Sequence, residues 1–224
     1  MNRSHQWMSG LALSTLLLVG CVSKVTEKEQ YSGYLDRYDV LKPAVSASGA
    51  PTLRWVSSTF NPSAYDTAIF DELVLYPAPK ATDRVNVQTL EQLRSTASQG
   101  AMSALSKRYR VVDSSRQVPA GGRALILRAA ITGVSASNEG MKWYEVIPVA
   151  AVVGTVSAAS GHRDQNSELY LEAALLDAQT NEPLARVVRK VFGKQLNNAS
   201  TQITASDFDQ AIKDLTNDLG AFIK

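Results

Sequence analysis

The sequence predicts an α+β fold, in which two main helices pack on one face of an antiparallel or mixed sheet. Three observations lead to this prediction. Residues 87–109 repeat apolar side chains every three or four positions, as an amphipathic helix does. Residues 168–176 and 184–192 flank a turn-rich heptapeptide, which predicts a hairpin. Residues 206–222 then return to the helical period.

The remaining elements are expected to be short. Tyr34 to Leu41 have a helical spacing that Pro43 ends, and residues 44–51 have the small, turn-forming composition of a loop or linker. Further strands are expected at 53–56, 69–76, 109–112 and 123–134. No internal repeat or low-complexity tract divides the sequence.

Short polar side chains predict where the two helices begin. Thr89 and Gln92 have the spacing of a capping box at the start of the first helix. Ser206 precedes Asp207 and Asp209, and this order is typical of an N-cap followed by acidic residues in the first turn.

The first twenty residues read as a bacterial secretory signal. Arg3 supplies a positive charge, and Leu11 to Val19 form an apolar run well short of the roughly 20 residues that a membrane-spanning helix needs. The sequence Leu-Val-Gly-Cys ending at Cys21 resembles the lipobox of bacterial lipoproteins. That resemblance implies acylation of Cys21, the lipidation site, and cleavage before it.

The chain therefore divides into three parts. Residues 1–20 are expected to be a cleaved lipoprotein signal peptide, 21–33 a flexible tether, and 34–224 a single α+β periplasmic domain. Acyl chains on Cys21 would attach the protein to a membrane. Because Val22 stands where an Asp would signal retention in the inner membrane, we expect an outer-membrane, periplasm-facing location.

Charge and cysteine content exclude some classes of partner. The chain has 23 basic and 21 acidic residues, with a net charge of +2, and no basic patch interleaved with aromatic residues. Nucleic acid is therefore not an expected partner. Cys21 is the sole cysteine, so no intrachain disulfide is possible.

The sequence offers few residues for catalysis, and no catalytic, metal or cofactor site is predicted. Once residues 1–20 are removed, His162 is the only histidine, in a polar, loop-like stretch. Paired carboxylates exist at Asp71 and Glu72 and at Glu168 and Glu172. They fall on strand positions, where outward-facing charges are the usual explanation.

Residues 146–160 are apolar and rich in small residues, with Pro148 near their start. We expect them to be buried against the sheet, because soluble domains rarely expose large apolar patches. The alternatives are insertion into a membrane or contact with another subunit. The flanking Trp143 and Tyr144 would suit an interfacial anchor or a core equally well.

Several short patterns resemble one family. They are Tyr31–Leu35 (YSGYL), Asn61–Asp66 (NPSAYD), Leu73–Pro77 (LVLYP) and Glu172–Leu184 (EAALLDAQTNEPL). These patterns resemble the bacterial lipoproteins grouped as domain of unknown function 3313. The resemblance implies a lipid-anchored envelope protein and assigns no reaction or catalytic residue.

The leading hypothesis is a lipid-anchored, non-enzymatic binding or assembly component at the outer membrane, with a protein partner in the envelope. The alternative is a periplasmic enzyme that uses carboxylates, or a small-ligand binder. A third possibility is self-assembly through residues 146–160. The sequence does not define the oligomeric state.

We predict that Cys21→Ser abolishes lipid attachment and leaves the fold intact, because the thiol carries the acyl chains and no core contact is expected to depend on it. Metabolic labelling with a radioactive fatty acid should mark the wild-type protein alone. Label retained by the serine variant would show that the lipobox assignment is wrong.

Overall fold

The computed structural model describes residues 24–136, 165–197 and 200–224, and these contain one mixed, eight-stranded sheet and two α-helices. The α+β prediction is thus confirmed. The strand order is β1-β2-β8-β7-β6-β3-β5, and β4 also pairs with β6. The strands are β1 Lys42–Val45, β2 Pro51–Val56, β3 Thr67–Ile69, β4 Val74–Leu75, β5 Arg110–Val112, β6 Ala124–Ala136, β7 Gln165–Asp177 and β8 Pro183–Leu196.

The long antiparallel strands β6, β7 and β8 form the centre of the sheet. The expected hairpin is β7–β8, and its turn is built as the composition suggests. The carboxylate of Asp177 accepts hydrogen bonds from the backbone N–H groups of Gln179 and Thr180, and Asn181 takes a left-handed conformation with φ of 58°. Both strands extend beyond the predicted bounds at each end.

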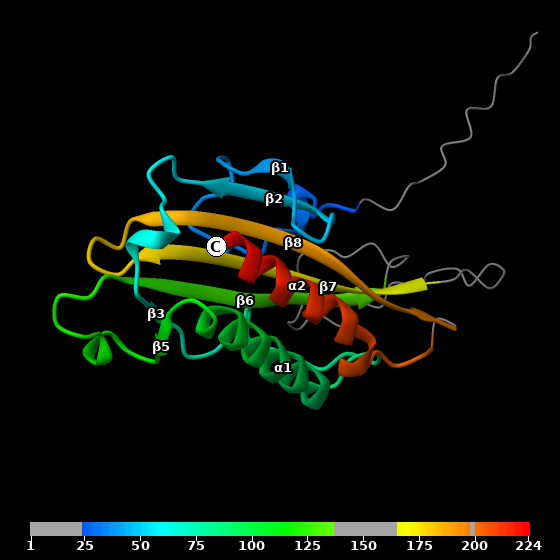
Figure 1. Cartoon of the computed structure of the whole chain (residues 1–224). Coiled ribbons are helices and arrows are strands. Elements are labelled where there is room, and N and C mark those ends of the chain that lie inside the picture. Colours follow the sequence, from blue (N-terminus) through cyan, green and yellow to red (C-terminus); the bar gives the residue numbers. More distant parts are fainter. Residues whose placement is uncertain (1–23, 137–164, 198–199) are drawn as a thin grey trace, which may run out of the picture.

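Both helices lie on the same face of the sheet, as predicted (Figure 1). These are α1 Val87–Ser106 and α2 Asp209–Phe222. The predicted stripe of α1 is buried, with Leu93 and Leu105 fully enclosed. The two helices approach closely at Gly100, where a β carbon would overlap the hydroxyl of Thr216. One apolar core therefore lies between the helices and the sheet.

The predicted strand over residues 69–76 is wrong, because β3 and β4 are separate. Both pair in parallel with β6, but Ile69 lies opposite Ile126 and Val74 opposite Ala130. Val74 follows Ile69 by five positions, but their partners on β6 are only four positions apart. β3 and β4 therefore cannot form one continuous strand paired in register with β6. The break is stabilised locally, since the N–H of Leu73 donates to the Ser98 hydroxyl of α1 at 2.9 Å.

The prediction of helical turns over residues 34–41 is also wrong, and the loop or linker predicted over 44–51 is confirmed only for 46–50. The N–H of Leu35 donates to the Tyr38 hydroxyl and to Glu172 on β7, so tertiary contacts replace the helical hydrogen bonds. Residues 42–45 form edge strand β1, and the turn to β2 closes with a hydrogen bond from Ser46 N–H to the Ala50 carbonyl.

Helix α1 begins with a different cap from the one predicted. The side chain of Asn86 accepts the N–H of Thr89, and this bond takes the place of a Thr89–Gln92 box. Before α2, a short 3₁₀ turn (Ala205–Phe208) is closed by a capping box between Thr204 and Asp207, two residues earlier than a cap at Ser206 would be.

The N-terminal segment packs on the sheet face opposite the helices. Thr26 is buried, Gln30 Nε2 donates to the Tyr170 hydroxyl at 3.1 Å, and Ser32 N–H donates to Glu172 at 2.9 Å. Packing therefore begins before Tyr34, within the part of the chain expected to be a tether.

Some expectations fall on residues that the structure does not describe. They concern Cys21, Trp143, Tyr144, the segment 146–160 and His162. Across the described residues, none of the helices combines the length and the apolar character that crossing a membrane requires.

The helix assignment makes a prediction about stability. Leu93→Asp or Leu105→Asp should unfold the domain, because either change buries a carboxylate without a partner at a cost of several kcal/mol. Gln92→Ala should be nearly silent, since Gln92 is exposed. Thermal melts of the three variants test this, and equal melting temperatures would contradict the packing of α1.

Candidate ligand-binding site

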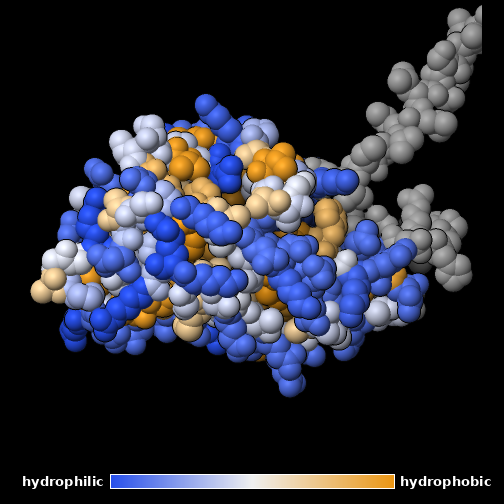
Figure 2. All heavy atoms as spheres, in the orientation of Figure 1, coloured by the Kyte–Doolittle hydropathy of each residue, from blue (hydrophilic) through white to orange (hydrophobic). Residues whose placement is uncertain are grey.

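A cavity of about 430 Å³ lies between the helices and the centre of the sheet. Its sheet wall includes Ala129, Leu171, Ala173 and Leu175, and its helix wall includes Ala97 and Leu215. The volume and the mainly apolar lining are those of small-ligand pockets. In Figure 2, apolar side chains lie between hydrophilic ones near the middle of this helix-bearing face.

Small side chains on facing elements leave this space. Ala129, Ala173 and Ala185 lie on the three central strands, and Ala97 and Ala101 of α1 face them. Ala173 lies in the middle of the sheet and faces the helices, yet it is only partly buried. A side chain at such a central position is normally enclosed, so the partial exposure of Ala173 indicates that solvent reaches the cavity.

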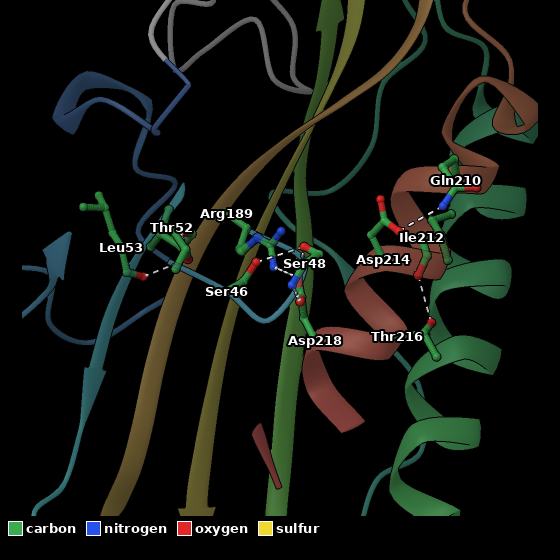
Figure 3. A network of polar contacts seen from close by, with 11 residues as sticks. Ser46, Ser48, Thr52, Leu53, Arg189, Gln210, Ile212, Asp214, Thr216 and Asp218 are labelled. Atoms are coloured by element: carbon green, nitrogen blue, oxygen red, sulfur yellow. Dashed lines mark hydrogen bonds and ion pairs between the residues drawn. The ribbon is translucent and has the colours of Figure 1, made fainter. Parts of the chain in front are cut away.

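A buried ion pair forms one polar edge of the cavity (Figure 3). Arg189 Nη1 of β8 lies 2.6 Å from Asp218 Oδ2 of α2, and both side chains are more than 90% buried, at 6% and 8% exposure. Ser48, in the β1–β2 turn, donates its N–H and its hydroxyl to the same carboxylate, at 2.6 and 2.9 Å. Asp218 thus joins three separate elements.

This network sets the charge of Asp218. Burial opposes ionisation of the carboxyl group, but the hydrogen bonds from Arg189 and Ser48 outweigh it, and the pKa of Asp218 lies below its ordinary value. The group is therefore an ionised structural carboxylate at neutral pH.

Three arginines contribute atoms to the cavity lining, but the side chain of Arg186 projects to the opposite face of the sheet. Arg186 is paired with Asp36 at 2.7 Å, and Arg189 with Asp218. The guanidinium of Arg54, on β2, instead lies 5.5 Å from the centre of the Phe222 ring. Within the described part of the chain it has no carboxylate partner.

The carboxylates Glu168 and Glu172 were expected to face outward, and this is wrong. Each is at most 3% exposed, on the sheet face that the N-terminal segment covers. Glu168 pairs with Lys190 at 2.9 Å and accepts from the Tyr170 hydroxyl at 2.6 Å. Glu172 accepts from the Tyr38 hydroxyl at 2.5 Å and from the backbone of the N-terminal segment. The covering segment thus supplies the hydrogen bonds that make burial of Glu172 possible, whereas Glu168 is satisfied by side chains of the sheet itself.

These contacts hold protons on the tyrosines. Burial first, and then the neighbouring Glu172 carboxylate, raises the pKa of Tyr38. Burial and the Glu168 carboxylate do the same for the pKa of Tyr170. Both hydroxyls therefore act as fixed hydrogen-bond donors at neutral pH.

The other predicted carboxylate pair, Asp71 and Glu72, is exposed as expected for surface charges, and Glu72 forms an ion pair with Arg94 of α1. Within the three described ranges, no group of three or more His, Cys, Asp or Glu side chains could hold a metal ion. The cavity was not predicted from the sequence. The sequence features that could have indicated it are the alanines of the central strands and an arginine at an inward-facing position of β8.

The class that these features define is a small α+β domain with an internal apolar cavity, preceded by a sequence typical of envelope lipoproteins. The chain belongs to the family described as "Protein of unknown function (DUF3313)", which matches residues 30–219. The resemblance found in the sequence is thereby confirmed.

A relative from Escherichia coli K12, the "Uncharacterized lipoprotein YdcL", is 41% identical over 207 residues, which cover 92% of this chain and 91% of the relative. The same protein from strain O157:H7 matches equally well. Its description as a lipoprotein agrees with a membrane-anchored envelope protein.

Solved structures show only distant similarity. A PelC dodecamer from Paraburkholderia phytofirmans gives a TM-score of 0.37 at 10% identity, covering 73% of this chain and 96% of that one. A putative neuraminyllactose-binding hemagglutinin homolog from Helicobacter pylori gives 0.33 at 10% identity, with coverage of 75% and 83%.

We predict that Asp218→Asn lowers the free energy of unfolding by about 3 kcal/mol at pH 7, because it leaves the Arg189 charge buried without a counter-charge. Asp214→Asn on the same helix is the control, since Asp214 is less buried and accepts a hydrogen bond from the uncharged Gln210 side chain. Urea unfolding of the detergent-solubilised protein measures both.

The same pair of proteins tests the charge of Asp218. A lowered folded-state pKa stabilises the fold above the ordinary carboxyl pKa of about 3.9, and this contribution is lost as the pH falls through the folded-state value. The difference between wild type and Asp218→Asn should therefore shrink below about pH 4. A difference independent of pH would contradict the ionised pair.

Proposed function

We propose that this protein is a non-enzymatic binding protein of the outer membrane, anchored through acyl chains on Cys21 and facing the periplasm, and that it holds a small apolar ligand in its internal cavity. The observation that carries the proposal is the cavity of about 430 Å³ between the helices and the sheet. Val22 after the anchor cysteine supports the outer-membrane location.

The state of the carboxylates supports binding over catalysis. A carboxylate enzyme would need acidic groups that converge on a pocket with raised pKa values. Asp218 is the acidic residue on the cavity wall, and its pKa is lowered by the bonds that tie it to Arg189 and Ser48. Glu168 and Glu172 are engaged on the opposite sheet face.

The packing of the N-terminal segment supports a position close to the membrane. Thr26 is 4% exposed and follows Cys21 by five residues, which span at most about 18 Å when fully extended. An anchor at Cys21 would therefore keep the domain within a short distance of the bilayer. Such a position suits a ligand that is itself present in membranes.

A protein partner in the envelope is the second candidate, favoured by the edge of the sheet. Strand β1 is the last strand on its side in the described sheet, and its Val45 is 64% exposed. Crosslinking in envelopes followed by affinity capture tests this candidate. Recovery of the bait alone under several crosslinkers would count against it.

The cavity makes a direct prediction. Wild-type protein purified from envelopes should release a co-purified apolar small molecule on denaturation, detected by mass spectrometry. Ala173→Trp should abolish this release, because the indole fills the cavity beside Leu171 and Leu175. The control is Ala120→Trp, at an exposed position outside the cavity.

Thermal melts of both variants separate loss of ligand from loss of folding. Ala173→Trp should melt close to the wild type, since the added volume enters existing space. A folded Ala173→Trp protein that releases the same molecule in the same amount would contradict the cavity as the binding site.

A further inference from the structure

Arg54 is a cation placed at an apolar cavity, and among the described residues it has no counter-charge. The other arginine whose side chain faces the cavity, Arg189, has the carboxylate of Asp218 as its partner. Arg54 contacts the ring of Phe222, which is the last residue of α2. A cation–π contact leaves guanidinium N–H groups free to donate to an acceptor.

A second unsatisfied donor lies beside Arg54. The Nε–H of Arg189 is buried and has no acceptor among the described residues, although its Nη1 pairs with Asp218. Arg54 lies opposite Val187 in the β2–β8 ladder, so Arg189 is its diagonal neighbour, and both side chains project to the helix face. Long side chains at such positions can reach one common acceptor.

The rest of the cavity lining is mainly apolar. Leucines and alanines of β7, α1 and α2 form its walls, including Leu171, Leu175, Ala97, Ala101 and Leu219. If one methylene group fills about the volume of one water molecule, on the order of 30 Å³, the space of about 430 Å³ has the size of one acyl chain.

From this arrangement we propose that the cavity binds a single-chain amphiphile with an anionic head group, the chain lying between the sheet and the helices and the head group held by Arg54 with the Arg189 Nε–H. The inference rests on the proposed function and names the ligand class of the same cavity. A guanidinium suits a carboxylate or a phosphate, because both offer paired acceptor oxygens.

The test uses the full lipoprotein in isolated envelopes and a palmitic acid probe that carries a photoreactive diazirine in its chain. The matching fatty alcohol probe has the same chain and no charge. After irradiation, the protein is purified and the crosslinked peptides are located by mass spectrometry. Adding the probe after growth keeps it out of any acyl chains already present on the protein.

We expect the acid probe to crosslink to peptides containing Leu171–Leu175 or Leu215–Phe222. Arg54→Gln should reduce this labelling about fivefold, the size of effect expected for a partly exposed ion pair, and should leave labelling by the alcohol unchanged. The control is Arg128→Gln, which removes an exposed charge from the opposite face of the same sheet and should have no effect.

Unlabelled competitors identify the source of the head group. Palmitic acid or lysophosphatidic acid should displace the acid probe, and whichever does so more strongly identifies a carboxylate or a phosphate as the preferred head. Competition by two-chain phosphatidylglycerol as strong as by either would overturn the single-chain assignment.

The remaining outcomes separate this inference from the proposed function. Equal cavity labelling by acid and alcohol, unaffected by Arg54→Gln, would overturn the anionic head group and leave an apolar ligand site. Crosslinks that avoid the cavity peptides in every protein, and that persist in Ala173→Trp, would overturn both.

Discussion

The ion pair between Arg189 and Asp218 is the constraint on which the arrangement of the helix layer depends. It fixes α2 to the central strand β8, and through Ser48 it fixes the β1–β2 turn to the same helix. Replacing a buried pair by apolar side chains of similar volume is often neutral for stability. An ion pair at this position holds α2 in place without filling the space beside it, where alanines on β6, β7 and β8 leave the cavity.

Strands β7 and β8 contribute both to the wall of the proposed ligand cavity and to the binding of the N-terminal segment. On one face they present the alanines and leucines of the cavity wall, and on the other they present Glu168, Glu172, Arg186 and Lys190. Glu172 and Arg186 bind the N-terminal segment, which leads from the proposed anchor at Cys21 to the domain. Because side chains alternate along a strand, the same strands that hold the anchor segment also position the cavity wall.

The sequence was sufficient for the features that depend on periodicity. The amphipathic pattern of α1, the β7–β8 hairpin with its Asp177 turn, and the placement of both helices on one face were all predicted and are present. These features are local, or depend on one continuous apolar stripe. The family resemblance was likewise carried by short local patterns, such as Asn61–Asp66.

The features that depend on distant partners were not predicted. Residues 34–41 have a helical spacing, but Tyr38 and Leu35 bond Glu172, more than a hundred positions away in sequence. Glu168 and Glu172 alternate with apolar residues as surface charges do, and only the segment that covers them makes them buried. The candidate site was missed for the same reason, since Arg54, Arg189 and Asp218 come from β2, β8 and α2.

We propose that an acyl chain occupies the space beside the Arg189–Asp218 pair. Methyl NMR of alanine-labelled protein, titrated with palmitic acid, measures this most directly, because Ala97, Ala101, Ala129, Ala173 and Ala185 all line that space. We expect saturable shifts of these methyl signals, while the signal of the exposed Ala120 stays constant. Saturation confined to methyls outside the cavity, with those five unchanged, would contradict it.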